Sequence, residues 1–297
     1  MSLLTNKTEP MKSSPAAAAL FLATMTATTT ALTSRARAEP IALGDGEKLE
    51  FRVGWGIFTH AGEITVAASA APATGGAQAG TRVLTSLATS GIVGKLYKLE
   101  ASGDCLFDGR DGRILTAETN SIAGKKHTST KAVFDYANKV MRFEDLVRPQ
   151  NNATLPLPKA ETMDLITALV QTRAWAMKPG DARPIVAIFE DEFYELTVTA
   201  LGYEKVKSPW GEVNALILAP APSPGVEPKG MFKKGAVVRV WVSQDERRLP
   251  VKFQLGLKYG TGTAYLVKHT PPAAADAAVP SEARSLTIPN PKIPNPK

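Results

Sequence analysis

The stretch Leu49-Glu50-Phe51-Arg52-Val53-Gly54-Trp55 alternates apolar residues with polar or small ones along its whole length. A period of two places these two sets of side chains on opposite faces of an extended strand. After a break at His60-Ala61-Gly62, the apolar residues Ile64, Val66 and Ala68 continue the pattern. The two segments therefore predict an opening hairpin of an antiparallel sheet.

The same alternation recurs through most of the chain. Segments rich in apolar and β-branched residues are separated by Gly, Pro, Asn or Asp, which are turn-forming residues. The predicted strands cover residues 82–90, 114–121, 129–135, 139–144, 185–190, 193–201, 213–219, 237–243, 250–256 and 264–269. Short alternating segments of this kind are typical of a mainly β, antiparallel protein.

One segment follows a helical period instead. Apolar residues recur there every three or four positions: Leu165, Ile166, Leu169, Val170 and Trp175. Asp164 suits the N-terminal end of a helix dipole, and Lys178-Pro179-Gly180 supplies a stop. We therefore predict one amphipathic helix that begins near Thr162–Asp164. Residues 93–99 fit a second, short helix or a strand.

Composition excludes several classes of protein. The 297 residues are 44% apolar and 21% charged, with a formal charge of +7 and a single cysteine, Cys105. These values are unlike those of a multi-span membrane protein or a wholly disordered chain. One cysteine also rules out intramolecular disulfides, zinc ribbons and iron–sulfur clusters. In an oxidising compartment we expect Cys105 to be buried as a small apolar residue.

The N-terminal region has the pattern of an export signal. Lys7 and Lys12 precede an uncharged stretch, residues 13–34, and Ala36-Arg37-Ala38 follows it. This order predicts a secretory signal peptide over residues 1–38, cut after Ala38, with Met1 or Met11 as the start. The alternative is an uncleaved anchor helix, since the stretch is long enough to cross a bilayer. Cleavage leaves a charge of about +4, too small to demand an acidic partner such as nucleic acid.

The C-terminal region changes character again. Residues 271–297 are rich in proline, and Ile-Pro-Asn-Pro-Lys occurs twice, at 288–292 and 293–297. Such a composition predicts an extended or disordered tail. The chain is therefore expected to comprise a leader (1–38), a β-rich domain (39–270) and a tail (271–297).

The sequence contains no recognisable catalytic or metal-binding motif. Only three histidines are present, without a His-x-x-x-His pair, a Gly-x-Ser-x-Gly elbow or a phosphate-binding glycine loop. The triplet Glu190-Asp191-Glu192 is more typical of a solvated turn than of a glycosidase pair or a calcium site. We therefore predict no catalytic residues, no metal and no cofactor, and favour a protein that is not an enzyme.

Several short motifs occur together in one order along the chain. They are Trp55-Gly56-Ile57 with Ala61-Gly62-Glu63, Phe134-Asp135, Met163-Asp164-Leu165, Ser208-Pro209-Trp210-Gly211, and Val240-Trp241-Val242-Ser243 with Asp245, Arg247, Arg248, Leu249 and Pro250-Val251. In combination, from Leu49 to His269, they resemble the bacterial exported family catalogued as domain of unknown function 3108. The resemblance implies a strongly curved antiparallel sheet, or a partly open barrel, around one helix in the cell envelope. It implies no established activity.

A curved sheet around a helix encloses a space that large side chains either fill or line. The candidates for an apolar lining are Trp55, Phe58, Trp175, Phe189, Tyr194, Trp241 and Phe253. We therefore expect a periplasmic protein, not integral to the membrane after signal cleavage, that binds or carries a hydrophobic envelope ligand such as a lipid or lipid-bearing partner. The alternatives are a solidly packed assembly factor that contacts other envelope proteins, and a carbohydrate-active binder or hydrolase.

Overall fold

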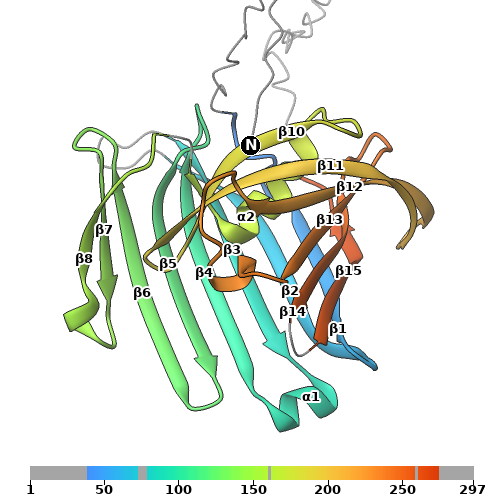
Figure 1. Ribbon diagram of the computed structural model, residues 1–297, viewed down its shortest axis with the longest axis horizontal. Helices are drawn as coiled ribbons and strands as arrows, with labels where there is room; N and C mark the ends of the chain where they lie inside the picture. Colours follow the sequence, from blue (N-terminus) through green and yellow to red (C-terminus); the bar gives the residue numbers. More distant parts are fainter. Residues whose placement is uncertain (1–38, 73–78, 160–161, 258–259, 274–297) are drawn as a thin grey trace, which may run out of the picture. The chain divides into compact units, whose positions relative to one another are not determined.

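A computed structural model describes residues 39–72, 79–159, 162–257 and 260–273 (Figure 1). The predicted leader, residues 1–38, lies outside the described residues, as do residues 274–297 of the predicted tail. Residues 271–273 of the predicted tail are described. The last of them contacts the domain, because the Ala273 backbone N–H donates a 2.8 Å hydrogen bond to the Asp45 carbonyl oxygen.

Strands account for most of the described chain. They are β1 (Lys48–Trp55), β2 (Phe58–Ala71), β3 (Gly80–Thr89), β4 (Leu99–Asp108), β5 (Ile114–Ala123), β6 (Lys126–Asp135), β7 (Val140–Asp145), β8 (Ala153–Pro156), β9 (Thr162–Asp164), β10 (Ala182–Phe189), β11 (Glu192–Ser208), β12 (Gly211–Pro222), β13 (Val237–Ser243), β14 (Pro250–Leu257) and β15 (Gly260–Thr270). The helical elements are α1 (Gly91–Leu96), α2 (Leu165–Gln171) and the 3₁₀ turns η1 (Pro149–Asn151), η2 (Thr172–Ala174) and η3 (Gly230–Phe232). No helix among the described residues has the length and apolar character needed to cross a membrane.

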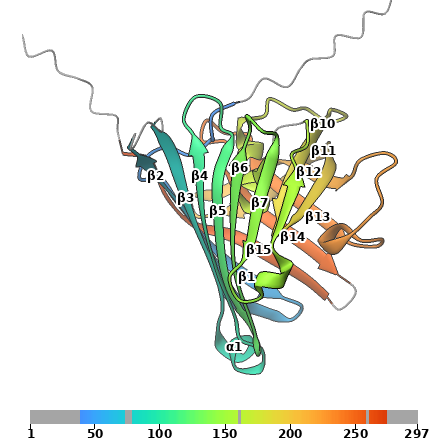
Figure 2. The same cartoon turned by 90° about the vertical axis from the view of Figure 1, so that its left-hand side faces the viewer.

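The fifteen strands of the described residues form one sheet in the order β8-β7-β6-β5-β4-β3-β2-β1-β15-β14-β13-β12-β11-β10-β9. Neighbours are antiparallel, apart from the short parallel pair of β9 and β10. The sheet is strongly curved, and it is not closed because its edge strands β8 and β9 do not pair (Figures 1 and 2). The predicted mainly β fold with a curved antiparallel sheet is therefore confirmed.

The opening hairpin turns earlier than predicted. Trp55 pairs with Phe58, so the turn is Gly56-Ile57, and Gly56 takes a φ of +56°. A glycine with positive φ at the first turn position suits a two-residue hairpin. His60, Ala61 and Gly62 instead lie inside β2. Gly62 is needed there for close approach of the strands, since a Cβ added to it would lie 2.5 Å from the Ala88 carbonyl oxygen.

The predicted helix is present, but it ends before Trp175, the last residue of the apolar spacing that predicted it. It comprises Leu165–Gln171, and Thr162–Asp164 forms β9 instead of the first turn. Asp164 is the N-cap, and its Oδ1 accepts hydrogen bonds from the backbone N–H groups of Ile166 and Thr167 at 3.0 and 3.1 Å. Trp175 follows the helix in extended backbone after η2.

A buried polar cluster holds the end of this helical segment against the sheet. Oε1 of Glu47 accepts a 2.6 Å hydrogen bond from Arg173 and lies 2.9 Å from Nε2 of His269, which belongs to β15. Oε2 of Glu47 accepts a bond from the Gly44 backbone N–H. Burial raises the pKa of the Glu47 carboxyl, but the bonds from Gly44, Arg173 and His269 outweigh burial and leave its pKa lowered. The carboxylate thus joins three parts of the chain as a charged group.

Cys105 is buried on β4, as expected. Burial and the nearby Asp164 carboxylate both raise the pKa of its thiol well above the ordinary value. The thiol is therefore kept in its protonated, unreactive form, and Cys105 packs as a core residue among apolar neighbours.

Candidate functional site

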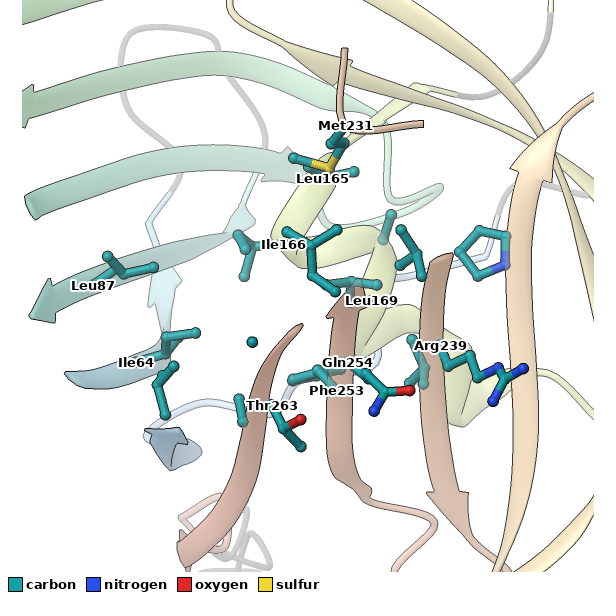
Figure 3. Close-up of a pocket in the computed structure, with 18 of the residues that line it drawn as sticks. Ile64, Leu87, Leu165, Ile166, Leu169, Met231, Arg239, Phe253, Gln254 and Thr263 are labelled. Carbon is teal, nitrogen blue, oxygen red and sulfur yellow. The ribbon is translucent and has the colours of Figure 1, made fainter. Parts of the chain in front are cut away.

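The inner face of the curved sheet, together with α2, lines a partly open cavity of about 600 Å³. The surrounding strands run from β4 through β3, β2, β1, β15, β14 and β13 to β10, and η3 adds Met231 and Phe232. Figure 3 shows Ile64 of β2, Leu87 of β3, Leu169 of α2 and Phe253 of β14 around one central space. These side chains come from distant parts of the sequence, so curvature of the sheet creates the site.

The interior of the cavity is apolar because of strand register. Val240, Phe253 and Ala264 face inward on three neighbouring strands, and the pairs Val240–Phe253 and Phe253–Ala264 are in register. The polar row Arg239, Gln254 and Thr263 is offset from them by one residue in each strand. These three residues also border the cavity, but successive side chains alternate faces, so their side chains are directed to the opposite face of the sheet. In Figure 3 the polar groups of Arg239 and Gln254 point away from the central space.

Trp55 forms one wall of the cavity near the β1–β2 turn. Its ring lies against Gly260 and Gly262 of β15, and a Cβ added to Gly262 would lie 3.0 Å from the ring carbons. The absence of side chains at these two positions gives the indole room to lie along the strand. The glycines therefore determine where this wall stands.

Three of the seven predicted lining residues meet at the cavity: Trp55, Trp175 and Phe253. Trp175 is 1% exposed and packs with Val198, Leu216 and Val240. Phe253 packs on Phe51 with their ring centroids 4.9 Å apart. Each side chain thus serves both as a core residue and as cavity wall.

The other four predicted lining residues lie elsewhere, which corrects that part of the prediction. Phe58 follows the shift in register between β1 and β2 and lines a separate hollow on the other face of β1 and β15. Trp241 alternates with Val240, so its ring faces away from the cavity, and its Nε1 donates a 3.1 Å bond to Glu204. Tyr194 packs on Phe232 and donates to Glu192 at 2.8 Å, while Phe189 is exposed at the end of β10.

The polar candidates do not assemble into a reactive site. His60 lies 3.3 Å from Glu63 on an exposed part of β2, whereas His269 is bound to Glu47. Glu190 and Asp191 form the turn between β10 and β11. In the part of the chain that the structure describes, no three His, Cys, Asp or Glu side chains gather where they would hold a metal ion.

Residues 50–267 match the family described as "protein of unknown function (DUF3108)". The chain belongs to the DUF3108 family. No curated protein matches it.

The DUF3108 chain has a structural likeness to a β-barrel-like protein of the domain of unknown function DUF1849 from Brucella abortus, with a TM-score of 0.52 at 8% identity. That match covers 77% of this chain and 98% of the Brucella protein, and at this identity it shows a shared fold. A protein of Parabacteroides distasonis described as a candidate lipoprotein aligns over 78% of this chain and 97% of its own, at 8% identity and a TM-score of 0.28. The DUF3108 fold thus extends to at least one other uncharacterised family.

Sequence reasoning missed most of the aliphatic lining. Ile64, Leu87 and Leu255 belong to strands that were predicted, and Leu169 to the predicted helix, but nothing in the local pattern marks them as cavity residues. The sequence does indicate, through the alternation along each strand, which residues face the inside of the sheet. Only the curvature of the sheet decides whether the side chains on that inner face pack against one another or surround a cavity.

Proposed function

We propose that this DUF3108 protein is an exported, non-enzymatic protein that binds a hydrophobic envelope ligand, a lipid or a lipid-bearing partner, inside the curved sheet. The observation that carries the proposal is the cavity of about 600 Å³ with apolar walls on every contributing strand. Its volume falls in the range of about 300–1,000 Å³ typical of small-molecule sites. An acyl chain gains about 0.8 kcal/mol for each methylene that it buries, so an apolar chain suits these walls.

Binding is testable with a fluorescent fatty acid and one matched pair of variants. Leu87 faces the cavity opposite Ile64, and Leu84 lies three residues earlier on the same strand, 45% exposed on the other face. Leu87→Gln places a neutral amide of similar size in the apolar wall. A bound acyl chain would displace the water that hydrogen-bonds this amide, and the lost hydrogen bonds would weaken binding. We expect roughly tenfold weaker binding for Leu87→Gln and no change for Leu84→Gln, measured by fluorescence titration.

Two further outcomes decide between this function and its alternatives. Native mass spectrometry of protein purified from its own host is expected to show a co-purifying lipid. An empty protein that also fails to take up the fluorescent fatty acid contradicts the ligand-binding function and favours the assembly factor. Binding of a soluble oligosaccharide with no uptake of fatty acid favours the carbohydrate-active alternative.

Export rests on the leader over residues 1–38, and the folded region supports a cut after Ala38. Ile41 and Leu43 are buried, and Gln171 bonds the Pro40 carbonyl oxygen and the Ala42 backbone N–H. These contacts hold residues 40–43 against α2, so the proposed cut leaves them in the mature chain. N-terminal sequencing of protein isolated from the periplasm is expected to begin at Glu39, and a start at Met1 or Met11 contradicts cleavage.

A further inference from the structure

Exposed apolar side chains gather at one end of the sheet, around α1. The first residues of β2, which follow the β1–β2 turn, lie beside the start of α1, because the Ser90 backbone N–H donates to the Ala61 carbonyl oxygen. The β5–β6 turn lies beside the end of α1, because the Gly124 backbone N–H donates to the Lys98 carbonyl oxygen. Figures 1 and 2 show α1 beyond the ends of β3 and β4. We define the α1 rim as the exposed apolar residues Ile57, Ile92, Leu96, Tyr97 and Ile122.

Three of the rim residues, all aliphatic, have most of their surface exposed to solvent. Ile57 is 89% exposed at the tip of its turn, and Leu96 and Ile92 are 77% and 61% exposed. Ile92 and Leu96 are four residues apart and so share one side of α1. Val93 of α1 lines the cavity, and Tyr97, which directly follows the helix in extended backbone, borders the cavity while remaining 53% exposed. The same short helix therefore borders the cavity and presents two large aliphatic side chains to solvent.

Positive charge surrounds these apolar side chains. Lys95 lies on α1, and Lys125 and Lys126 lie at the β5–β6 turn, all exposed. None of the three forms an ion pair with another described residue. Of the nearby acidic residues, Glu100 is paired with Lys98 at 3.2 Å, and Glu63 lies 3.3 Å from the His60 ring. The end of the sheet is thus apolar at its tips and basic around them.

We propose that the α1 rim docks on an anionic phospholipid surface, with Ile92 and Leu96 entering the boundary between headgroups and acyl chains. Apolar residues that project from separate tips suit a bilayer interface, whereas a protein partner is usually met by a groove or a flat patch. Tyrosine is favoured at that interface, and lysines are attracted to anionic headgroups. Docking in this orientation places the α1 side of the cavity next to the bilayer.

Vesicle flotation tests the docking. The mature chain is expected to float with vesicles of phosphatidylglycerol and phosphatidylcholine, and to bind phosphatidylcholine vesicles on the order of 100-fold more weakly, because the attraction of three lysines is lost. Leu96→Glu is expected to weaken binding to the anionic vesicles at least about tenfold. Leu201→Glu is the matched control, since Leu201 is 49% exposed on β11, outside the rim. Equal loss in both variants, or no flotation of the unmodified chain, overturns the proposal.

A fluorophore reports where the contact lies. An environment-sensitive dye on Leu96→Cys is expected to shift to the blue on anionic vesicles, whereas the same dye on Leu201→Cys keeps its spectrum. Cys105 is buried, so the label attaches at the introduced thiol. No shift at position 96, or an equal shift at position 201, contradicts docking through the rim. Leu96→Glu is expected to retain uptake of the fluorescent fatty acid, so failure of docking and failure of ligand binding are distinguishable.

Discussion

Replacement of Glu47 by alanine is expected to lower the free energy of unfolding by about 3–5 kcal/mol at pH 7. Glu47 is 2% exposed, and its carboxylate pairs with the Arg173 guanidinium at 2.6 Å and lies 2.9 Å from Nε2 of His269. Removing it leaves the Arg173 guanidinium largely buried without its anion. Chemical denaturation measures the loss. The exposed pair of Glu118 and Lys131 provides the control, because Glu118→Ala removes a surface ion pair worth at most about 1 kcal/mol.

The contribution of Glu47 also has a defined pH dependence. Its pKa in the folded protein is lowered from the ordinary value of 4.5. A carboxyl with a lowered pKa stabilises the fold fully above the unfolded value, and the contribution disappears as the pH falls through the folded value. The difference in stability between the unmodified chain and Glu47→Gln is therefore expected to shrink below pH 4.5. A difference that stays constant from pH 7 down to pH 3 contradicts this role of the charge.

Trp175→Ala is expected to lower the free energy of unfolding by about 3–5 kcal/mol. The indole is almost completely buried among Val198, Leu216 and Val240, and the Arg183 guanidinium lies 4.8 Å from the ring centroid. Because Trp175 also forms cavity wall, the truncation enlarges the cavity next to α2. Thermal and chemical denaturation measure the change.

Two variants test the origin of that loss. Trp175→Phe keeps most of the buried apolar surface, so its loss is expected to be clearly smaller than that of alanine. Trp210→Ala is a control at a partly exposed tryptophan, stacked on Arg247 at 4.1 Å in a turn, and is also expected to cost less. A loss from Trp175→Ala no larger than that from Trp210→Ala would show that the ring is not part of the core.

The strands were predictable because their signal is local. β13 has the bounds that alternation predicted, Val237–Ser243, and β14 differs by one residue. β4 was missed because its inward residues are partly small: Ala101, Gly103 and Cys105 separate Leu99 from Phe107 and weaken the alternation. The helix was predicted too long, since Trp175 continues the apolar spacing while its backbone is extended.

Sequence by itself determined the class of fold, because alternation of apolar and polar residues records which face of each strand is buried. It also determined family membership, through motifs spread over one long region. Only the tertiary structure decided that the buried faces of distant strands surround a space, and which aromatic residues border it. Trp55 and Trp241 sit in similar alternating segments, yet Trp55 faces the cavity and Trp241 the opposite side. The physical reason is that strand pairing and sheet curvature set which face is enclosed, and both depend on contacts between residues far apart in the chain.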